Sequence, residues 1–168
     1  MLFRSQLQAL CELSAISCEL TQFPVRVTCC TQLVRLFFSQ NRIMTIPPGL
    51  QSLTRLTHFD LSSNMISTIP PNLYSLTGLT HLDLSYNDIQ HVAPGLNKLS
   101  QIQVMNLQNN KIQSMPIDII GCKYLQYLNL HDNPFRIPEA ILYKYDNTHD
   151  ILVYLRDVVR GIVTSGKR

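Results

Sequence analysis

Apolar and polar positions alternate along this chain in a pattern that repeats every 23 residues. A Leu or Ile opens each of six copies, at Leu10, Leu33, Leu56, Leu79, Ile102 and Leu125. Within the copies the fourth and sixth residues are apolar, as Leu82 and Leu84 are on either side of Asp83. Alternation with a period of two predicts a short β-strand with one buried face. Because all copies share one spacing, we expect their strands to stack into a parallel sheet.

The second half of each copy predicts an extended outer segment. Apolar residues recur there at positions fourteen, eighteen and twenty-one. Position fifteen is proline in four copies, at Pro24, Pro47, Pro70 and Pro116. Proline fixes φ and stiffens an extended segment. In the copy that opens at Leu79 the proline lies one place later, at Pro94, which we interpret as a local variation.

The ninth position of five copies is asparagine, at Asn41, Asn64, Asn87, Asn110 and Asn133. The chain must turn sharply there, which leaves backbone N–H and C=O groups inside the molecule. An inward amide both donates and accepts hydrogen bonds, so it satisfies groups of its own turn and of the adjacent copy. We therefore predict a structural ladder of asparagines with no catalytic role. The first copy has Cys18 in this column, and its thiol is a weak substitute.

A period in the twenties that contains LxLxxN is typical of leucine-rich repeats. The sequence thus predicts an α/β fold, a leucine-rich repeat solenoid with short parallel β-strands on the concave face. Its convex side is expected to be irregular or 3-10 helical. Such solenoids offer a curved surface to other proteins.

The C-terminal part predicts an amphipathic helix that caps the solenoid. From Thr148 onward, apolar residues recur at spacings of three and four, at Ile151, Leu152, Leu155, Val158, Val159 and Ile162. Asn147 or Thr148 is the expected N-cap, and Asp150 favours the positive end of the helix dipole. Because a solenoid needs its open end covered, we interpret this helix as a cap, and a partner-binding helix is the alternative.

The domain organisation follows from these boundaries. Residues 1–9 are interpreted as the remnant of a preceding repeat or a weak N-terminal edge, and 10–137 as five 23-residue copies plus a partial last one. Residues 138–163 are the expected C-terminal cap with its helix, and 164–168 a frayed tail. The length leaves no room for a second domain.

The composition of the chain indicates which classes of partner and which cellular compartment to expect. The chain has 14 Lys and Arg against 11 Asp and Glu, and the basic residues are scattered, so we expect no nucleic-acid partner. Polar residues interrupt the N-terminal apolar stretch, which argues against a signal sequence or a membrane span. Five cysteines, an odd count, favour a reducing, cytoplasmic location. We expect a monomer.

The outward columns of the strands are the candidate binding surface. We predict that a protein partner contacts residues of the third, fifth and eighth columns, namely Arg35, Phe37, His58, Asp60, His81, Asp83, Tyr86 and Tyr127. Outward aromatic residues and arginine supply much of the binding energy at protein interfaces.

His58 and His81 share one column beside Asp60 and Asp83, a combination that also occurs in metal sites and catalytic sites. A metal site would need further ligands that the sequence does not supply, and we predict no metal, no cofactor and no catalytic residue. If an acidic partner group docks beside the histidines, we expect it to bind more tightly below the ordinary histidine pKa of about 6.5. The neighbouring carboxylates would blunt this effect by favouring the charged imidazoles already.

The copy pattern LxxLxLxxNxIxxIPPxLxxLxx resembles the intracellular, Ras-suppressor-like class of leucine-rich repeats. The end of the chain is similar to that of the leucine-rich repeat-containing protein 40 family, through Asn133-Pro134-Phe135-Arg136, Ala140-Ile141-Leu142 and the segment from Ile151 to Asp157. The resemblance implies a cytoplasmic, non-enzymatic repeat protein. Members of that family carry many more repeats, so the chain resembles either a short relative or a truncated C-terminal portion.

The function expected from the sequence is a non-catalytic scaffold that binds a protein on the concave strand face. A regulatory subunit of a phosphatase or small-GTPase signalling complex is the alternative. An enzyme with its site at the His/Asp patch is the weakest hypothesis, because an open face offers no pocket or oxyanion hole.

Overall fold

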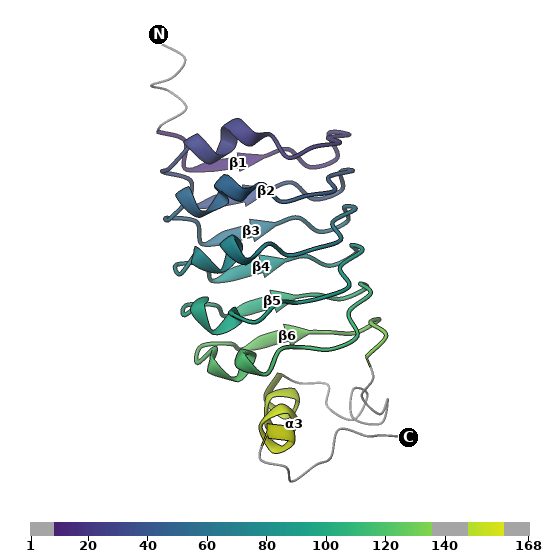
Figure 1. The fold of residues 1–168 in the computed structure, drawn as a ribbon. Coiled ribbons are helices and arrows are strands. Elements are labelled where there is room, and N and C mark those ends of the chain that lie inside the picture. The colour runs from purple at the N-terminus through teal and green to yellow at the C-terminus, as the bar shows by residue number, and fades with distance from the viewer. Residues whose placement is uncertain (1–8, 136–147, 160–168) are drawn as a thin grey trace.

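The computed structural model describes residues 9–135 and 148–159. Six three-residue strands form one parallel sheet in chain order: β1 (Glu12–Ser14), β2 (Arg35–Phe37), β3 (His58–Asp60), β4 (His81–Asp83), β5 (Val104–Asn106) and β6 (Tyr127–Asn129). Every residue pairs with the one that lies one repeat further along, as Leu36 does with Phe59. The strands form one side of a curved stack (Figure 1). The predicted repeat register and fold class are confirmed.

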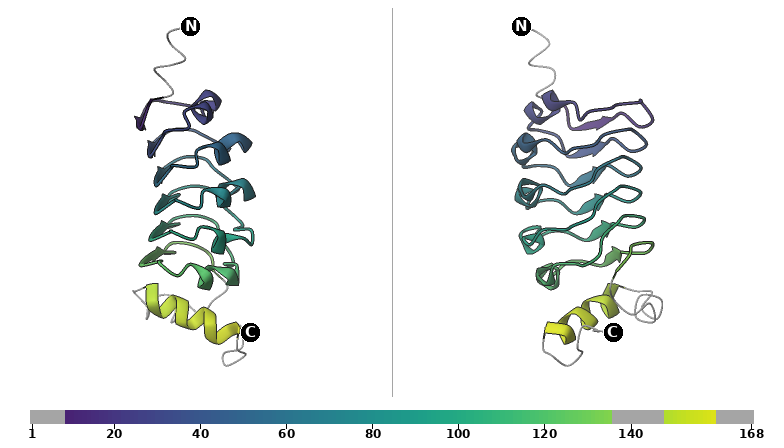
Figure 2. Two further views of the ribbon diagram at one scale, coloured as in Figure 1. Left: turned by 90° about the vertical axis from the view of Figure 1, so that its left-hand side faces the viewer. Right: turned by 45° about the vertical axis from the view of Figure 1, so that its right-hand side comes forward.

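The convex side consists of short 3-10 helices, and Figure 2 shows them opposite the strands. They are η1 (Val25–Cys29), η2 (Pro48–Ser52), η3 (Pro71–Ser75), η4 (Leu96–Lys98) and η5 (Ile117–Gly121). Pro47, Pro70 and Pro116 precede three of them in extended conformation. Proline is tolerated at such a start because the first N–H groups of a helix have no partner within the helix.

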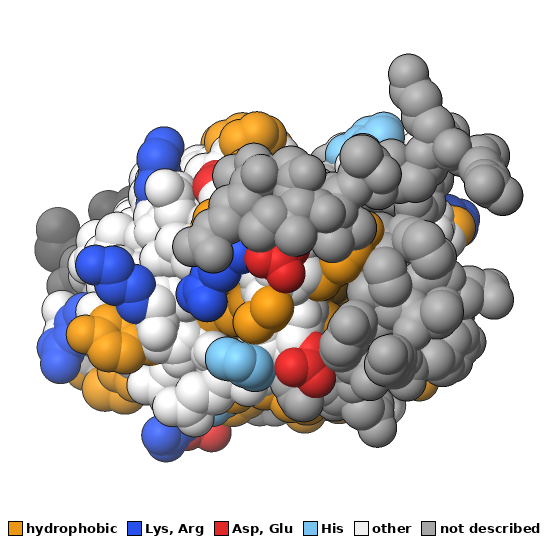
Figure 3. All heavy atoms as spheres, turned by 90° about the horizontal axis from the view of Figure 1, so that it is seen from below, with side chains coloured by type: hydrophobic (Ala, Val, Ile, Leu, Met, Phe, Trp, Pro, Cys, Tyr) orange, Lys and Arg blue, Asp and Glu red, His pale blue; other side chains and the backbone are white. Residues whose placement is uncertain are grey.

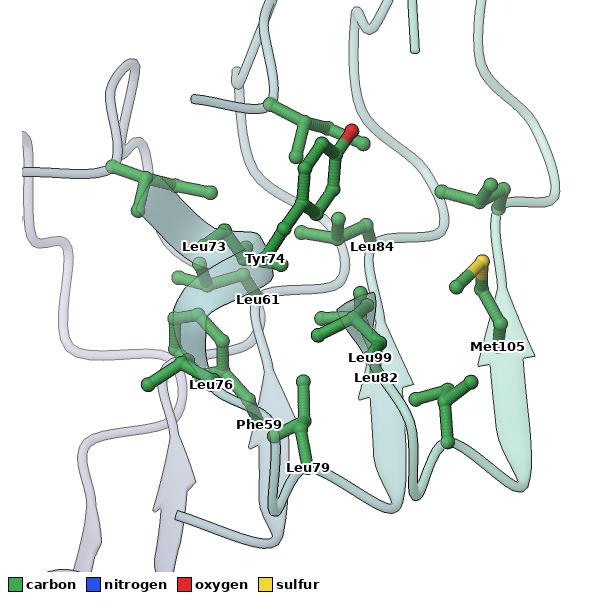
Figure 4. Packing of buried hydrophobic residues seen from close by; sticks show 14 of the residues in the cluster. Phe59, Leu61, Leu73, Tyr74, Leu76, Leu79, Leu82, Leu84, Leu99 and Met105 are labelled. Atoms are coloured by element: carbon green, nitrogen blue, oxygen red, sulfur yellow. The ribbon is translucent and has the colours of Figure 1, made fainter. Parts of the chain in front are cut away.

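Apolar side chains fill the space between the strands and the 3-10 helices. Leu36, Phe59, Leu82, Met105 and Leu128, the central residues of β2 to β6, are all buried. Figure 4 shows residues of β3 and β4 meeting leucines from the convex side. Burying a side chain of this size stabilises the fold by roughly 1.5–3 kcal/mol, so each copy contributes through contact with its neighbours.

The asparagine column lies inside the turn that follows each strand. The Nδ2 atom of Asn64 donates to the carbonyls of Leu61 and Ser62 in its own turn and of Phe38 in the preceding copy, at 2.9–3.2 Å. Its Oδ1 accepts the N–H of Ile43 at 2.9 Å. The same pattern recurs at Asn87, Asn110 and Asn133. Each amide thus joins two copies through buried backbone groups.

The first copy is less well covered than the others. Leu10, Leu13 and Leu20 are only half-buried, whereas Leu33 and Leu36, at the positions of Leu10 and Leu13 one repeat later, are fully buried. Cys18 is exposed, and its thiol reaches one carbonyl, that of Ile16, at 3.4 Å. A cysteine therefore replaces only part of what an asparagine does in this column.

Between η3 and η4 the convex side departs from the repeat. Tyr74 is buried, and its hydroxyl donates to the Ala93 carbonyl at 3.0 Å. Gly95 has φ +122°, and a Cβ there would lie 2.9 Å from Cδ2 of Tyr74. The tyrosine ring therefore requires glycine at this position. The shifted proline, Pro94, belongs to a copy whose convex side is built around this ring.

Asp118 of η5 holds the same region together. Its Oδ2 accepts the N–H of Gly95, while its Oδ1 is buried without a hydrogen-bond partner among the described residues. Burial, with the nearby Asp118 carboxylate, raises the pKa of Tyr74 to about 12 and that of Cys122 to about 11. Both groups therefore stay protonated at neutral pH.

Helix α3 (Thr148–Val159) lies beyond the last copy and packs against β6 and η5 (Figures 1 and 2). Leu152 and Leu155 are buried in this contact. The Thr148 hydroxyl accepts the N–H of Leu128 at 2.6 Å, so it satisfies a backbone donor of the last strand. Viewed from this end, hydrophobic, basic and acidic side chains lie interspersed (Figure 3). Asn147, Ile162 and the predicted tail at 164–168 are outside the described residues.

Candidate protein-binding surface

The first and third residues of each strand point away from the core and form two parallel rows. One row runs through Glu12, Arg35, His58, His81, Val104 and Tyr127, and the other through Ser14, Phe37, Asp60, Asp83, Asn106 and Asn129. We refer to these twelve residues as the strand face. Apart from Glu12, Ser14, Arg35 and Tyr127, which are exposed, these residues are half-buried.

The residues predicted to bind a partner fall into one group and two outliers. Six of them are contributed by three adjacent strands, β2, β3 and β4. Tyr127 is half-exposed on β6, and Val104 separates it from His81. Tyr86 is equally exposed but lies in the turn after β4 with φ 54°, so it does not belong to the strand. The two tyrosines therefore lie outside the group, whereas Phe37 lies within it on β2.

Arg35 is already paired within the chain. Its guanidinium contacts the Glu12 carboxylate of β1, with the Nη2 and Oε2 atoms 2.5 Å apart. Both side chains remain about half exposed, so the pair is worth no more than about 1 kcal/mol. A partner that binds Arg35 must compete with Glu12 or contact both charges together.

His58 and His81 stack on each other. Their ring centroids are 4.2 Å apart and the rings are inclined by 9°. Burial, and then the neighbouring His81 and Arg35, lower the pKa of His58 below its ordinary value. The expectation that the nearby carboxylates favour a charged imidazole is not met at His58, because desolvation and the two basic neighbours shift its pKa downward.

The third residues of β3 to β6 close the turn after their strand. Asp60 Oδ1 accepts the N–H of Ser62 at 2.8 Å, and Asp83 Oδ1 accepts that of Ser85 at 2.9 Å. In β5 and β6, Asn106 and Asn129 accept the equivalent bonds. These residues thus have a local backbone role in addition to the binding role predicted from the sequence.

Sequence reasoning missed the residues that orient the imidazoles. The hydroxyls of Thr57 and Thr80 lie 2.9 Å from Nδ1 of His58 and His81. The signal was present, because the segment LTHxDLS occurs in two successive copies, at 56–62 and 79–85. The threonine precedes the outward column, where the repeat pattern gives a residue no role.

The strand face offers hydrogen-bond acceptors, aromatic surface and charge. Among the described residues, no group of three or more His, Cys, Asp or Glu side chains is placed to hold a metal ion. Within the same residues, no helix is long and apolar enough to cross a membrane.

The repeat register, the inward leucines and the asparagine ladder define the class as a leucine-rich repeat solenoid. The family pattern described as leucine rich repeat matches residues 31–89 and 77–135. The chain belongs to the leucine-rich repeat family. No curated protein matches it.

Several solved structures are similar to this chain. An internalin, InlF of Listeria monocytogenes, is 30% identical with a TM-score of 0.62, over 68% of this chain and 33% of that one. The ectodomain of the receptor kinase SOBIR1 from Arabidopsis thaliana is 27% identical with a TM-score of 0.65, over 73% of this chain and 69% of that one.

The ectodomain of a second Arabidopsis thaliana receptor kinase, GASSHO1/SCHENGEN3, was crystallised in complex with CASPARIAN STRIP INTEGRITY FACTOR 2. It is 28% identical with a TM-score of 0.62, over 68% of this chain and 14% of that one. The chain thus spans about a third of the internalin and a smaller part of this receptor.

Proposed function

We propose that this protein is a non-catalytic scaffold that binds a protein partner on its strand face. The supporting observation is that Arg35, Phe37, His58 and their neighbours on β4 form one outward surface on adjacent strands. Leucine-rich repeat proteins generally act in protein interactions, and a receptor ectodomain of similar fold was crystallised with a partner.

The finer assignments are part of the same proposal. We place the protein in the Ras-suppressor-like class and in the cytoplasm, where its five unpaired cysteines would stay reduced. A regulatory subunit of a phosphatase or small-GTPase complex would use the same face. The identity of the bound partner distinguishes this alternative from a scaffold.

The test is a quantitative pull-down with the triple variant Phe37→Ala, Tyr86→Ala and Tyr127→Ala. We expect specific partners of the wild type to be depleted at least about tenfold, because aromatic anchors cost about 2 kcal/mol or more when truncated. Tyr124→Ala is the matched control, since Tyr124 is as exposed but lies in the loop before β6. Retention of all partners by the triple variant would exclude the strand face as the main interface.

A further inference from the structure

The duplicated segment LTHxDLS builds one compact surface on β3 and β4. It places His58 beside His81 and Asp60 beside Asp83 in the register of the sheet. Neither the family pattern nor the core requires these residues, because the same columns carry Val104, Tyr127 and asparagines in later copies. We call these four residues the His/Asp surface.

The hydrogen bonds of the threonines determine which nitrogen of each imidazole carries the proton. The Thr57 and Thr80 hydroxyls each also lie within bonding distance of a backbone carbonyl, at 3.1 and 2.9 Å. A hydroxyl has one proton, and a carbonyl accepts only. Both contacts are therefore satisfied when the hydroxyl donates to the carbonyl and accepts from Nδ1–H of the histidine. The Nε2 atoms of His58 and His81 are then acceptors.

The negative charge of the two aspartates exceeds what the fold needs. The turn bond requires an acceptor, and Asn106 and Asn129 provide it without a charge. Like charges on adjacent strands are destabilising. Asp60 and Asp83 are therefore carboxylates at positions where the neutral amide serves the turn equally well.

Charge on the strand face differs in sign from that of the chain. The full sequence has a net charge of +3, but the charged strand residues are Glu12, Arg35, Asp60 and Asp83. Since Arg35 pairs with Glu12, the two aspartates remain uncompensated. Asp60 Oδ2 has no hydrogen-bond partner within the described ranges, whereas Asp83 Oδ2 accepts from Asn106.

Building on the proposed function, we propose that the His/Asp surface recognises an arginine or lysine side chain of the protein partner. A guanidinium or ammonium group only donates hydrogen bonds, which complements the two Nε2 acceptors and the two carboxylates. Phe37 on β2 and Tyr86 after β4 flank this surface and contact the apolar stem or the neighbouring residues of the ligand.

The stacked histidines make this recognition sensitive to pH. The charged groups that face them are Arg35 on β2 and the aspartates of β3 and β4, while β5 contributes the uncharged Val104 and Asn106. Protonation would turn the Nε2 acceptors into donors and add positive charge beside a cationic ligand. Binding of a basic segment is therefore expected to weaken below the histidine range, opposite to the direction expected for an acidic partner.

The experiment uses three pools of short fluorescent peptides with the same random apolar and aromatic content. The pools carry Arg and Lys, Asp and Glu, or Gln and Ser at the remaining positions. Fluorescence anisotropy measures their binding to the wild type, to Asp60→Asn/Asp83→Asn, and to the aromatic triple variant. Asp88→Asn is the matched control, because Asp88 pairs with Lys111 away from the strands.

We expect the basic pool to bind the wild type and the Asp88→Asn control equally. The affinity of the Asp60→Asn/Asp83→Asn variant for the basic pool should fall about tenfold or more, which corresponds to the loss of one charge-assisted hydrogen bond. The melting temperature of this variant should stay near that of the wild type, because asparagine keeps the turn acceptor and the relief of like charge offsets the lost Asn106 bond. This readout separates lost recognition from misfolding. In the wild type, binding should also weaken as the pH falls below about 6.5, because the pKa of His58 lies below this ordinary histidine value.

Two results would overturn the inference. In the first, the acidic or neutral pool binds best and only the aromatic triple variant binds that pool more weakly. The preference for basic segments is then wrong and the proposed function stands. If neither variant changes the binding of any pool, both the inference and the proposed function fail.

Discussion

Asn87 joins two turns of the chain through a single amide. Its replacement by Ala leaves the Leu61, Leu84 and Ser85 carbonyls and the Ile66 N–H without this partner. Because these groups are buried, we expect the free energy of unfolding to fall by about 1–3 kcal/mol. The exposed Lys98→Ala should change it by less than about 0.5 kcal/mol. Equal urea midpoints for the two variants would contradict the structural role of the asparagine column.

Gly95 is the residue on which the Tyr74 ring depends. Gly95→Ala introduces a Cβ 2.9 Å from the ring at φ +122°, where side chains are strained. We expect a loss of stability of about 1–3 kcal/mol in thermal or urea unfolding. Gly78→Ala is the control, since its Cβ would lie at ordinary distance, 3.6 Å from the Thr54 carbonyl. A loss at Gly78 as large as at Gly95 would mean that the effect does not come from the contact with Tyr74.

The two residues differ in how far the sequence could predict them. Asn87 belongs to a column, and five recurrences reveal its role without coordinates. Tyr74 and Gly95 interact once, across two copies, so no repeated pattern marks them. The histidine stack was half predictable: the register follows from the spacing, but the ring orientation depends on Thr57 and Thr80. Burial of the rings, which lowers the His58 pKa, has no signature in sequence.

At the scale of elements, α3 replaces the next repeat. Leu152 and Leu155 cover the last copy. The Thr148 hydroxyl accepts the backbone N–H of Leu128, which would otherwise bond to a further strand. The apolar spacing predicts a helix here, and α3 confirms it. The bond from Leu128 was not predictable, because a threonine near a helix start is ordinarily interpreted as an N-cap.

Leu155→Asp tests whether this helix is a cap. A charge in the buried contact should detach α3 and expose Leu128 and Leu130, so amide exchange in β6 should accelerate at least about tenfold. Val153→Asp places the same charge on the exposed side of the helix and should leave β6 protected. Unchanged protection of β6 in Leu155→Asp would indicate a free, partner-binding helix.

For the whole molecule, the strands form a face whose chemistry is independent of the core behind it. Inward positions must be apolar in every copy, whereas outward positions vary from Phe37 through His58 to Val104. The fold could therefore be predicted almost entirely from repetition. The binding surface could be located but its specificity could not, since it depends on residues that break the repetition.

The constant offset between bonded residues also has a mechanical consequence. The asparagine bonds to the preceding copy join residues 21 or 26 positions apart, so each coil is tied only to its neighbour. Tension on the two ends would therefore release coils one after another, starting at the half-covered first copy. When a coil is released, its rise of one strand spacing is replaced by the length of an extended repeat. The molecule then lengthens by about 70 Å. Under load the molecule would therefore lengthen in steps of equal size.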